Sequence, residues 1–158
     1  MRTQLLILLL CFIGSLTSCQ REKETRVTDF VDPFIGTGGQ GHCFPGAAIP
    51  FGGIQLSPDN PRSGWEWCSG YHYSDSIISS FSHSHLSGTG IGDLQDIRLL
   101  PVTTRPQPGE RAIDFITKGY AKFSHANEFA EPGYYSVTFD NGIKTELSVT
   151  PRCGMHAY

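Results

Sequence analysis

A glycine-rich segment near the start of the chain has the spacing of a phosphate-binding loop. Residues 36–46 read GTGGQGHCFPG, and Gly36, Gly38 and Gly41 match the pattern GxGxxG. A dinucleotide-binding loop also needs a helix that begins at its last glycine, so that the pyrophosphate lies at the helix N-terminus. The next residues, HCFPG, place proline and glycine in what would be the first helical turns. No Gly-Lys-Ser/Thr follows, so a P-loop is excluded as well.

A second segment combines aromatic and polar side chains between glycines. Residues 64–73 read GWEWCSGYHY and contain both tryptophans of the chain, Trp65 and Trp67. Aromatic faces stack on the C–H faces of sugar rings, while neighbouring polar groups hold the hydroxyls. The alternative is that the two indoles, two residues apart, lie on one side of a strand and fill a core. These residues alone leave both interpretations open.

Two histidines are candidate metal ligands. If residues 81–85 are extended, His83 and His85 point to the same side, as two zinc ligands would. No HExxH motif accompanies them, and Asp93 or Asp96 would complete a site only through the fold. We therefore expect both rings to hydrogen-bond backbone carbonyls in a glycine-rich turn. Five aspartates are oxygen ligands or general bases in principle, but turn formation is the commoner role of aspartates in such loops: Asp32, Asp59, Asp75, Asp93 and Asp96.

These segments must be positioned by a domain that follows an export signal. Residues 5–13 read LLILLLCFI, an apolar run too short to span a bilayer. The small residues before Cys19 are typical of a bacterial lipoprotein signal that leaves this cysteine lipidated; an ordinary signal peptide is the alternative. Residues 20–26 are polar or charged and predict a solvated tether. We predict a signal peptide over 1–18, a tether over 19–28 and one domain over 29–158.

The export signal predicts a bacterial lipoprotein anchored to a membrane through Cys19, in the periplasm or at the cell surface. Gln20 after Cys19 favours the outer membrane. The net charge of −3 and the absence of a basic cluster give no indication of a nucleic-acid partner. Beyond the tether, Cys43, Cys68 and Cys153 permit at most one disulfide, and its pairing stays open.

The pattern of apolar residues predicts an all-β domain with long loops. Apolar segments are short and often alternate, among 18 glycines and 10 prolines. No segment keeps a helical period of 3.6 residues over a useful length. We expect strands within 51–57, 76–83, 94–100, 112–117, 120–124, 134–139 and 143–150.

The turn between the last two expected strands tests the register. A two-residue turn at Asn141-Gly142 would pair Phe139 with Lys144, apolar against charged. A three-residue loop with Gly142 in the left-handed region pairs Phe139 with Ile143 instead. Because a slip of one residue moves every side chain to the other face, we predict the three-residue loop with a G1 bulge.

Four segments in fixed order resemble the N-terminal domain of glycoside hydrolase family 92, a family of bacterial exo-acting α-mannosidases. The resemblance covers residues 29–158 and implies an antiparallel β-sandwich, followed in the family by a larger (α/α)6 barrel. It also implies a calcium-dependent enzyme that inverts the anomeric carbon. The four segments are VDPFIGTGGQGHCFPGAAIPFGGIQLSPD, GWEWCSGYHYSD, FSHSHLSGTGIGDLQDIRLLP and FSHANEFAEPGYYSV.

The resemblance implies that the acid and base lie outside this sequence. Inversion needs two carboxyl groups about 6.5–9.5 Å apart. In the family these groups and most calcium ligands belong to the barrel, and this sequence stops where the family continues towards it. We therefore expect no catalytic residue and no metal ligand here, and a chain truncated before its catalytic domain. Glu66 and Asp93 are not assigned as catalytic.

The resemblance also places the active site where the two domains meet. On this basis we expect the 36–46 and 65–73 loops to face that junction, because glycines let the backbone approach a sugar closely. Asp59 and Asp93 would give polar support. The residues expected to contact mannose are His42, Trp65, Trp67, Gly38 and Gly39.

Two classes of function follow. The first is the sugar-pocket module of an exo-α-mannosidase that acts on mannose-containing glycans and is inactive without the barrel. The second is a stand-alone carbohydrate-binding lipoprotein without catalysis. A module made to pack on a barrel should expose an apolar surface there, whereas a stand-alone binding protein should be polar. A zinc hydrolase built on His83 and His85 is a third, more distant class.

Overall fold

The structure, a computed structural model, describes residues 25–158 except 89 and 93. Apart from two short 3-10 helices and one α-helix, the elements of the described chain are strands. In chain order they are η1 (Val27–Phe30), β1 (Ser57–Asp59), η2 (Trp65–Trp67), β2 (Ile77–Ile78), β3 (Ser80–Ser82), α2 (Ala112–Lys118), β4 (Ala121–Glu131), β5 (Tyr134–Phe139), β6 (Lys144–Val149) and β7 (Gly154–Ala157).

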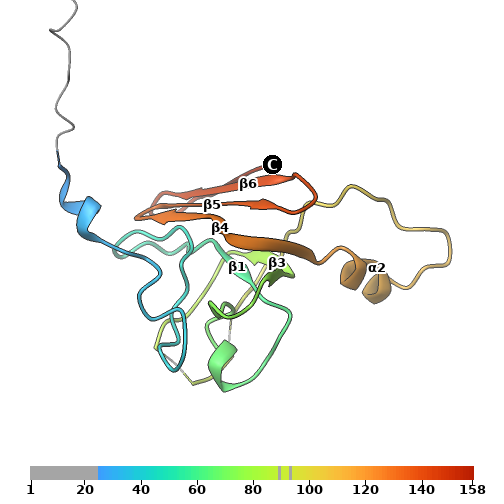
Figure 1. Ribbon diagram of the computed structural model, residues 1–158, viewed down its shortest axis with the longest axis horizontal. Coiled ribbons are helices and arrows are strands. Elements are labelled where there is room, and N and C mark those ends of the chain that lie inside the picture. The colour runs from blue at the N-terminus through green and yellow to red at the C-terminus, as the bar shows by residue number, and fades with distance from the viewer. Residues whose placement is uncertain (1–24, 89, 93) are drawn as a thin grey trace, which may run out of the picture.

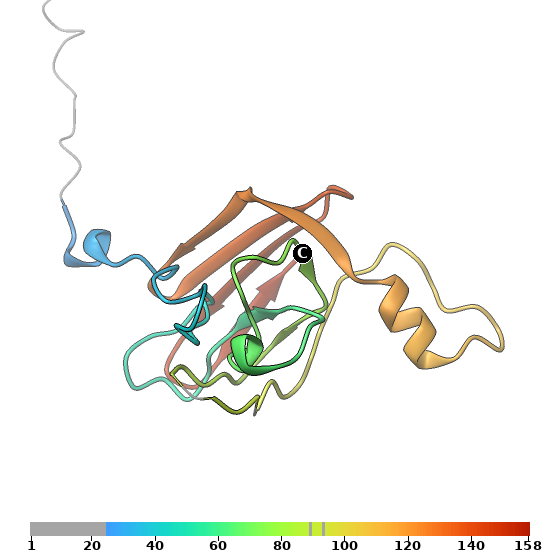
Figure 2. The same cartoon turned by 60° about the horizontal axis from the view of Figure 1, so that its bottom comes forward.

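Among the described residues these strands form two antiparallel sheets. The larger has the order β2-β4-β5-β6-β7, and the smaller consists of β1 and β3. Figure 1 shows β4, β5 and β6 stacked above β1 and β3, with α2 projecting to one side. In Figure 2 the long loops around η2 lie in front of the larger sheet. The expected all-β architecture with antiparallel sheets and long loops is confirmed.

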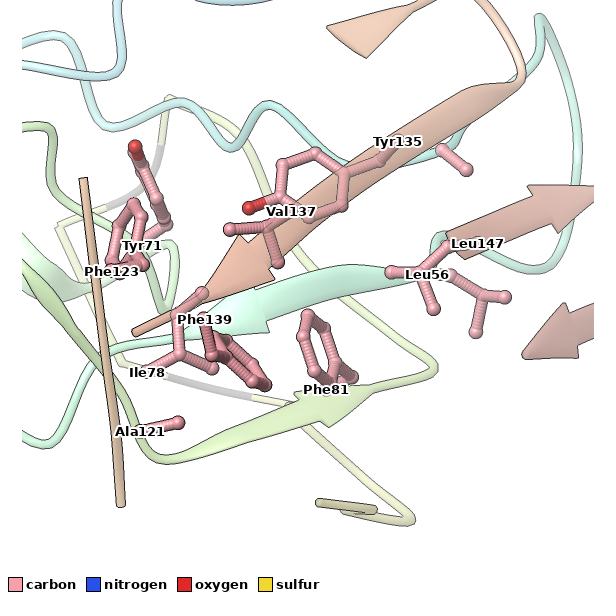
Figure 3. Packing of buried hydrophobic residues seen from close by; sticks show 11 residues of the cluster. Leu56, Tyr71, Ile78, Phe81, Ala121, Phe123, Tyr135, Val137, Phe139 and Leu147 are labelled. Carbon is pink, nitrogen blue, oxygen red and sulfur yellow. The ribbon is translucent and has the colours of Figure 1, made fainter. Parts of the chain in front are cut away.

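Aromatic and aliphatic side chains fill the space between the two sheets. Phe81 of β3 lies 6.0 Å from Phe139 and 6.5 Å from Tyr135 of β5, measured between ring centroids. Leu56 and Leu147 extend the same cluster, and each is completely buried. Figure 3 shows these side chains pointing towards one another from β3, β5, β6 and the chain beside β1. The core therefore comes from inward positions of both sheets.

The β5–β6 hairpin has the predicted register. Val137 pairs with Thr145 and Tyr135 with Leu147, so the buried side chains share one face. The amide of Phe139 donates to the carbonyl of Ile143 at 2.9 Å, which closes a three-residue loop. Gly142 has φ +86°, the left-handed position that the loop requires. The prediction of a G1-bulge loop is confirmed.

Two expected strands are wrong, the strand expected over 51–57 overlaps β1 only at Ser57, and one strand was not expected. Residues 112–117 belong to α2, where charges suit a helix: Asp114 lies in the first turn and Lys118 in the last. Residues 94–100 form no strand beyond a bridge from Leu99 to Phe81. Leu94, Gln95 and Ile97 have positive φ, which an extended strand does not allow. The unexpected strand is β7, which pairs with β6.

The described cysteines form no disulfide. No disulfide joins Cys43, Cys68 and Cys153, so the one bridge that the count permitted is not present among them. The short α2 is the longest helix of the described part, and no helix there has the length and apolar character needed to cross a bilayer. Cys19 and the signal segment lie outside the described residues.

Candidate functional site

The glycine-rich segment folds back on itself without entering a helix. The amide of Cys43 donates to the carbonyl of Gly36 at 3.0 Å, and that of Gly41 donates to Gly38 at 3.2 Å. A Cβ atom on Gly41 would lie 2.2 Å from the Gly36 carbonyl oxygen, so this close approach requires glycine. No helix follows the loop, which confirms that it is not a dinucleotide-binding loop. Residues 36–46 form a compact loop of backbone, which we call the rim.

His42 is held in this rim in an unusual state. Its φ is +51°, a left-handed conformation that costs a residue with a side chain about 1–3 kcal/mol. The residue is only 8% exposed, and its Nε2 atom has no hydrogen-bond partner among the described residues. Buried polar atoms without partners are rare in folded proteins and each calls for an explanation. Thr145 Oγ1 in β6 and His156 Nε2 in β7 are in the same state among the described residues, but neither lies beside an exposed indole. His42 is therefore the clearest candidate for a ligand contact.

Trp65 stands beside His42 and is open to solvent. Its indole meets the imidazole edge-on, with 4.8 Å between ring centroids, and the residue is 60% exposed. Its Nε1–H donates to the side-chain carbonyl of Gln40 in the glycine-rich loop. The ring also lies against Gly90, where a Cβ atom would clash with it. Three separate segments thus fix one exposed aromatic surface, instead of burying it.

Trp67 occupies a different setting at the end of η2. It is half-buried, and its Nε1–H donates to Asp75 Oδ2 at 2.6 Å. Its ring lies 5.0 Å from that of His72, whose Nε2 faces the Gly39 carbonyl at 3.3 Å. Trp67 thus links the 65–73 loop to the glycine-rich rim. Neither tryptophan belongs to the core between the sheets.

The glycines and aspartates expected at the site lie close to this rim. Gly38 is exposed beside Tyr73, and Gly39 has φ +57° with open space where a side chain would be. Asp59 is buried beneath Gly70 and accepts hydrogen bonds from Ser80 at 2.7 Å and Ser82 at 3.0 Å. It supports the loop from below. Asp93 lies outside the described residues.

His83 and His85 have separate partners. His83 Nδ1 lies 2.7 Å from the carbonyl of Ile97, and His85 Nδ1 lies 3.0 Å from that of Gln55. The expected bonds to backbone carbonyls are confirmed. His85 also places its Nε2 atom 3.0 Å from Asp59 Oδ1. The described residues contain no group of three or more His, Cys, Asp or Glu side chains that could hold a metal ion.

A buried carboxylate on β4 was missed by the sequence analysis. The side chain of Glu128 is 0% exposed and accepts from Tyr135 at 2.6 Å and Tyr71 at 3.0 Å, while His125 Nδ1 lies 2.7 Å away. Burial and the neighbouring Glu128 carboxylate raise the pKa of both tyrosines. A register shift between Phe123 and Glu128 accompanies this inward position. No sequence signal marks that irregularity.

Apolar side chains are exposed in the segment that follows β3. Leu86, Ile91, Leu94 and Ile97 are all exposed, and Ile97 reaches 71%. Ile97 also has φ +56°, which is rare for a β-branched residue. Hydrogen bonds between Gln95 and Ser84 and between His83 and Asp96 hold the backbone there. The segment keeps a strained shape that presents apolar groups to solvent, next to Gly90 under Trp65.

The chain matches known glycosidases over most of its length. Residues 30–158 match the glycosyl hydrolase family 92 N-terminal domain. A family GH92 α-mannosidase from Bacteroides thetaiotaomicron has a TM-score of 0.73 and 41% identity, over 84% of this chain and 18% of that enzyme. That enzyme has also been solved in complex with mannoimidazole. A family GH92 inverting mannosidase from the same organism has a TM-score of 0.61 and 27% identity, covering 85% of this chain and 18% of its own.

A sequence relative points the same way. An uncharacterized secreted glycosidase from Arthroderma benhamiae is 29% identical over 146 residues, which cover 87% of this chain and 18% of the relative. The chain thus spans about a fifth of the length of the relatives that it matches. Fold, sequence and motif order agree, and the chain belongs to glycosyl hydrolase family 92 as an N-terminal domain of that family.

Proposed function

We propose that this chain forms one wall of a mannoside-binding cleft in an inverting exo-α-mannosidase that acts on mannose-containing glycans. One observation carries the proposal: the buried, unpartnered Nε2 atom of His42 lies beside the exposed indole of Trp65. A sugar has both complementary parts, an apolar C–H face for the indole and hydroxyls for the imidazole. The likeness to α-mannosidases supports mannose as that sugar.

The rim offers further contacts to such a ligand. Around Gly39 no side chain fills the space where a Cβ atom would be, so a sugar could approach the backbone there. Trp67 and Asp59 hold the loop from behind through their bonds to Asp75 and to the β3 serines. The proposed roles are contact for His42, Trp65 and the glycines, and support for Trp67 and Asp59.

The proposal assigns the proton-transfer step to residues outside this chain. The buried carboxylates of Asp59, Asp75 and Glu128 are each bonded to side chains of the same domain. None of these three is free to protonate a leaving group, and no group of three or more His, Cys, Asp or Glu side chains gathers among the described residues. We therefore place the acid, the base and the calcium ligands on the barrel domain of the enzyme. Release of mannose by the purified chain alone would contradict this assignment.

Titration with mannose tests the binding role. Trp65 and Trp67 are the only tryptophans of the sequence, so their fluorescence reports a sugar at the rim. Binding should be lost in Trp65→Ala and His42→Ala and kept in Phe129→Ala, which removes an exposed aromatic ring on β4 instead. Equal affinity of all three variants would refute the proposed site.

A stand-alone carbohydrate-binding lipoprotein is the second candidate function. It is favoured by the completeness of the rim, since the His42–Trp65 pair needs no group from another domain. The exposed apolar side chains of residues 86–97 favour the first candidate, because a surface that packs on a barrel is apolar. Adding a separately purified family barrel domain discriminates the two. Recovery of mannose release, together with a stable complex, would support the enzyme module.

The proposed location is the outer membrane, through a lipid on Cys19. The evidence for it is the signal-like start of the sequence. Expression in a bacterial host with labelled palmitate should give a labelled, membrane-associated protein. The Cys19→Ser variant should be unlabelled and released in soluble form. Labelling that persists in this variant would exclude Cys19 as the anchor.

A further inference from the structure

The inner face of β4 carries a buried carboxylate at the point where the strand loses its register. Phe123 of β4 pairs with Phe139 of β5. The next pair is Glu128 with Val137, so four residues of β4, 124–127, lie opposite a single residue of β5. A regular period of two would put Phe123 and Glu128 on opposite faces, yet both side chains are buried. Bulges of this kind are common next to active sites, where they re-aim a side chain.

Glu128 orients a histidine that lies inside the bulge. The Nδ1 atom of His125 is 2.7 Å from Glu128 Oε2. Because a carboxylate only accepts hydrogen bonds, this nitrogen is the donor. Tyr71 and Tyr135 donate to the same carboxylate, at 3.0 and 2.6 Å, and keep it in place. The bulge therefore presents a fixed imidazole ring, whose side chain is 26% exposed.

This imidazole supports Tyr73, the last residue of the 65–73 loop. The rings of His125 and Tyr73 are stacked, with 4.0 Å between their centroids and 15° between their planes. Phe34 makes a T-shaped contact with Tyr73 at 6.0 Å. An aromatic pair contributes about 0.5–1.5 kcal/mol beyond the area that it buries. Tyr73 is 45% exposed, and these two rings fix its orientation nevertheless.

Tyr73 in turn is joined to the rim. Its amide donates to the carbonyl of Thr37 at 2.8 Å, and Thr37 is buried. The next residue is Gly38, where a Cβ atom would lie 3.7 Å from the Cβ atom of Tyr73. Gly38 is one of the rim glycines that we propose contact the sugar. A continuous series of contacts thus runs from Glu128 through His125 and Tyr73 to the rim.

The core alone does not account for these contacts. Burying a carboxylate costs several kcal/mol unless hydrogen bonds compensate, and a well-packed apolar residue is often at least as stabilising. Tyr71 and Tyr135 belong to the core, so their bonds to Glu128 compensate within it. His125 is different, because it is partly exposed and its ring face covers Tyr73 instead of the core. This contact indicates a role at the site.

We propose that Glu128 is a positioning residue for the rim, which it holds in its binding shape through His125 and Tyr73. The proposal rests on the proposed function and adds β4 to a site that the sequence analysis confined to loops. It gives Glu128 and His125 no contact with the ligand. Without this support the rim samples other shapes, and the apparent affinity falls in proportion to the fraction of molecules that stay competent to bind.

Two readouts on variants of the full chain test this role. Hydrogen exchange of the Tyr73 amide reports its bond to Thr37, and tryptophan fluorescence reports the binding of mannose. In Glu128→Leu and in His125→Ala the exchange should become about tenfold faster and the affinity should fall about tenfold. Glu128→Gln keeps a side chain that bonds to a tyrosine and to His125, so both values should stay within about twofold of the parent protein.

A change in the core is the matched control. Phe81→Leu weakens the packing between the sheets, and Phe81 has no ring contact with His125 or Tyr73. It should therefore lower the free energy of unfolding and leave both readouts unchanged well below the unfolding temperature. His125→Ala removes a partly exposed side chain, so it provides the test if Glu128→Leu does not fold.

The outcomes separate positioning from the proposed function. Unchanged Tyr73 exchange in the folded variants would overturn the proposal. Equal effects of Phe81→Leu would overturn it too, because they would reduce the contacts to general stability. Faster exchange with unaltered mannose affinity would mean that the ligand does not depend on this support. If the parent protein binds no mannose, the sugar cleft is wrong, and Tyr73 exchange alone decides whether Glu128 holds the rim.

Discussion

The core between the two sheets and the rim around His42 differ in packing and in backbone strain. In the core, side chains of β5 and β6 alternate between buried and more exposed positions, all three residues of β3 are buried, and Phe81 packs on Phe139. In the rim, His42 has left-handed backbone, Trp65 is exposed and a buried ring nitrogen lacks a partner. Strain and unpaired polar atoms cost free energy that packing elsewhere must offset. The difference supports the proposal that the rim is shaped for a ligand, while the core maintains the fold.

Asp59 joins the two regions. It ends β1, and its carboxylate binds Ser80 and Ser82 of β3 and faces His85 at the base of the rim. The same carboxylate lies under Gly70 of the 65–73 loop. A change at this residue should therefore affect both fold and site, whereas changes within either region should affect one of them.

The largest expected effect is in the core. Phe81→Ala should lower the free energy of unfolding by about 3–5 kcal/mol, because it opens a cavity between β3 and β5. Denaturant unfolding measures this change. Phe129→Ala, at an exposed position on β4, is the matched control and should cost far less. Similar losses for both variants would mean that the core is not where the structure places it.

A change at Asp59, which joins the core and the rim, should have the second-largest effect on stability. Asp59→Ala should cost about 3 kcal/mol, since it leaves His85 and two serines without their buried acceptor. It should also weaken mannose binding, which a purely structural change in the sheet would not do. Asp140→Ala, in the exposed hairpin loop, serves as the control for both readouts. Unaltered sugar affinity in a folded Asp59→Ala protein would mean that Asp59 does not support the rim.

The third-largest effect on stability should come from alkaline pH, which destabilises the core. The pKa of Tyr71 and that of Tyr135 are raised above 10.0 in the folded protein, first by burial and then by Glu128. Unfolded tyrosines ionise near pH 10 while the folded ones stay neutral, so stability is full below that pH and falls above it. Between pH 10 and 11 the two residues should cost about 2 kcal/mol together. Absorbance at the phenolate band should show them titrating only as the protein unfolds.

The smallest effect on stability should come from the rim. Trp65→Ala should change the free energy of unfolding by less than about 0.5 kcal/mol, because its ring is mostly exposed. The same variant should lose most of its affinity for mannose. Thermal unfolding and sugar titration on one preparation give both values. A large loss of stability would make Trp65 a structural residue and erase the contrast between the two regions.

The sequence was most informative where neighbours along the chain decide the structure. The two-residue period of residues 134–149 and the glycine at 142 predicted the β5–β6 register, because local pairing and turn geometry leave one solution. The local pattern was misread for 112–117. A short apolar segment was taken for a strand, whereas Asp114 in the first turn and Lys118 in the last turn suit the helix α2. The strand expected over 94–100 is wrong as well, because no sequence pattern predicts a left-handed backbone at Ile97.

The sequence by itself determined the all-β class and the family, and it singled out the loops proposed to bind a sugar, because these depend on residue types and on their order. Only the tertiary structure decided which side chains meet. Gln40 reaches Trp65 across 25 positions and His85 reaches Asp59 across 26, and Glu128 gathers two tyrosines from separate strands and loops. Such contacts depend on how distant segments pack, and so does the burial of His42.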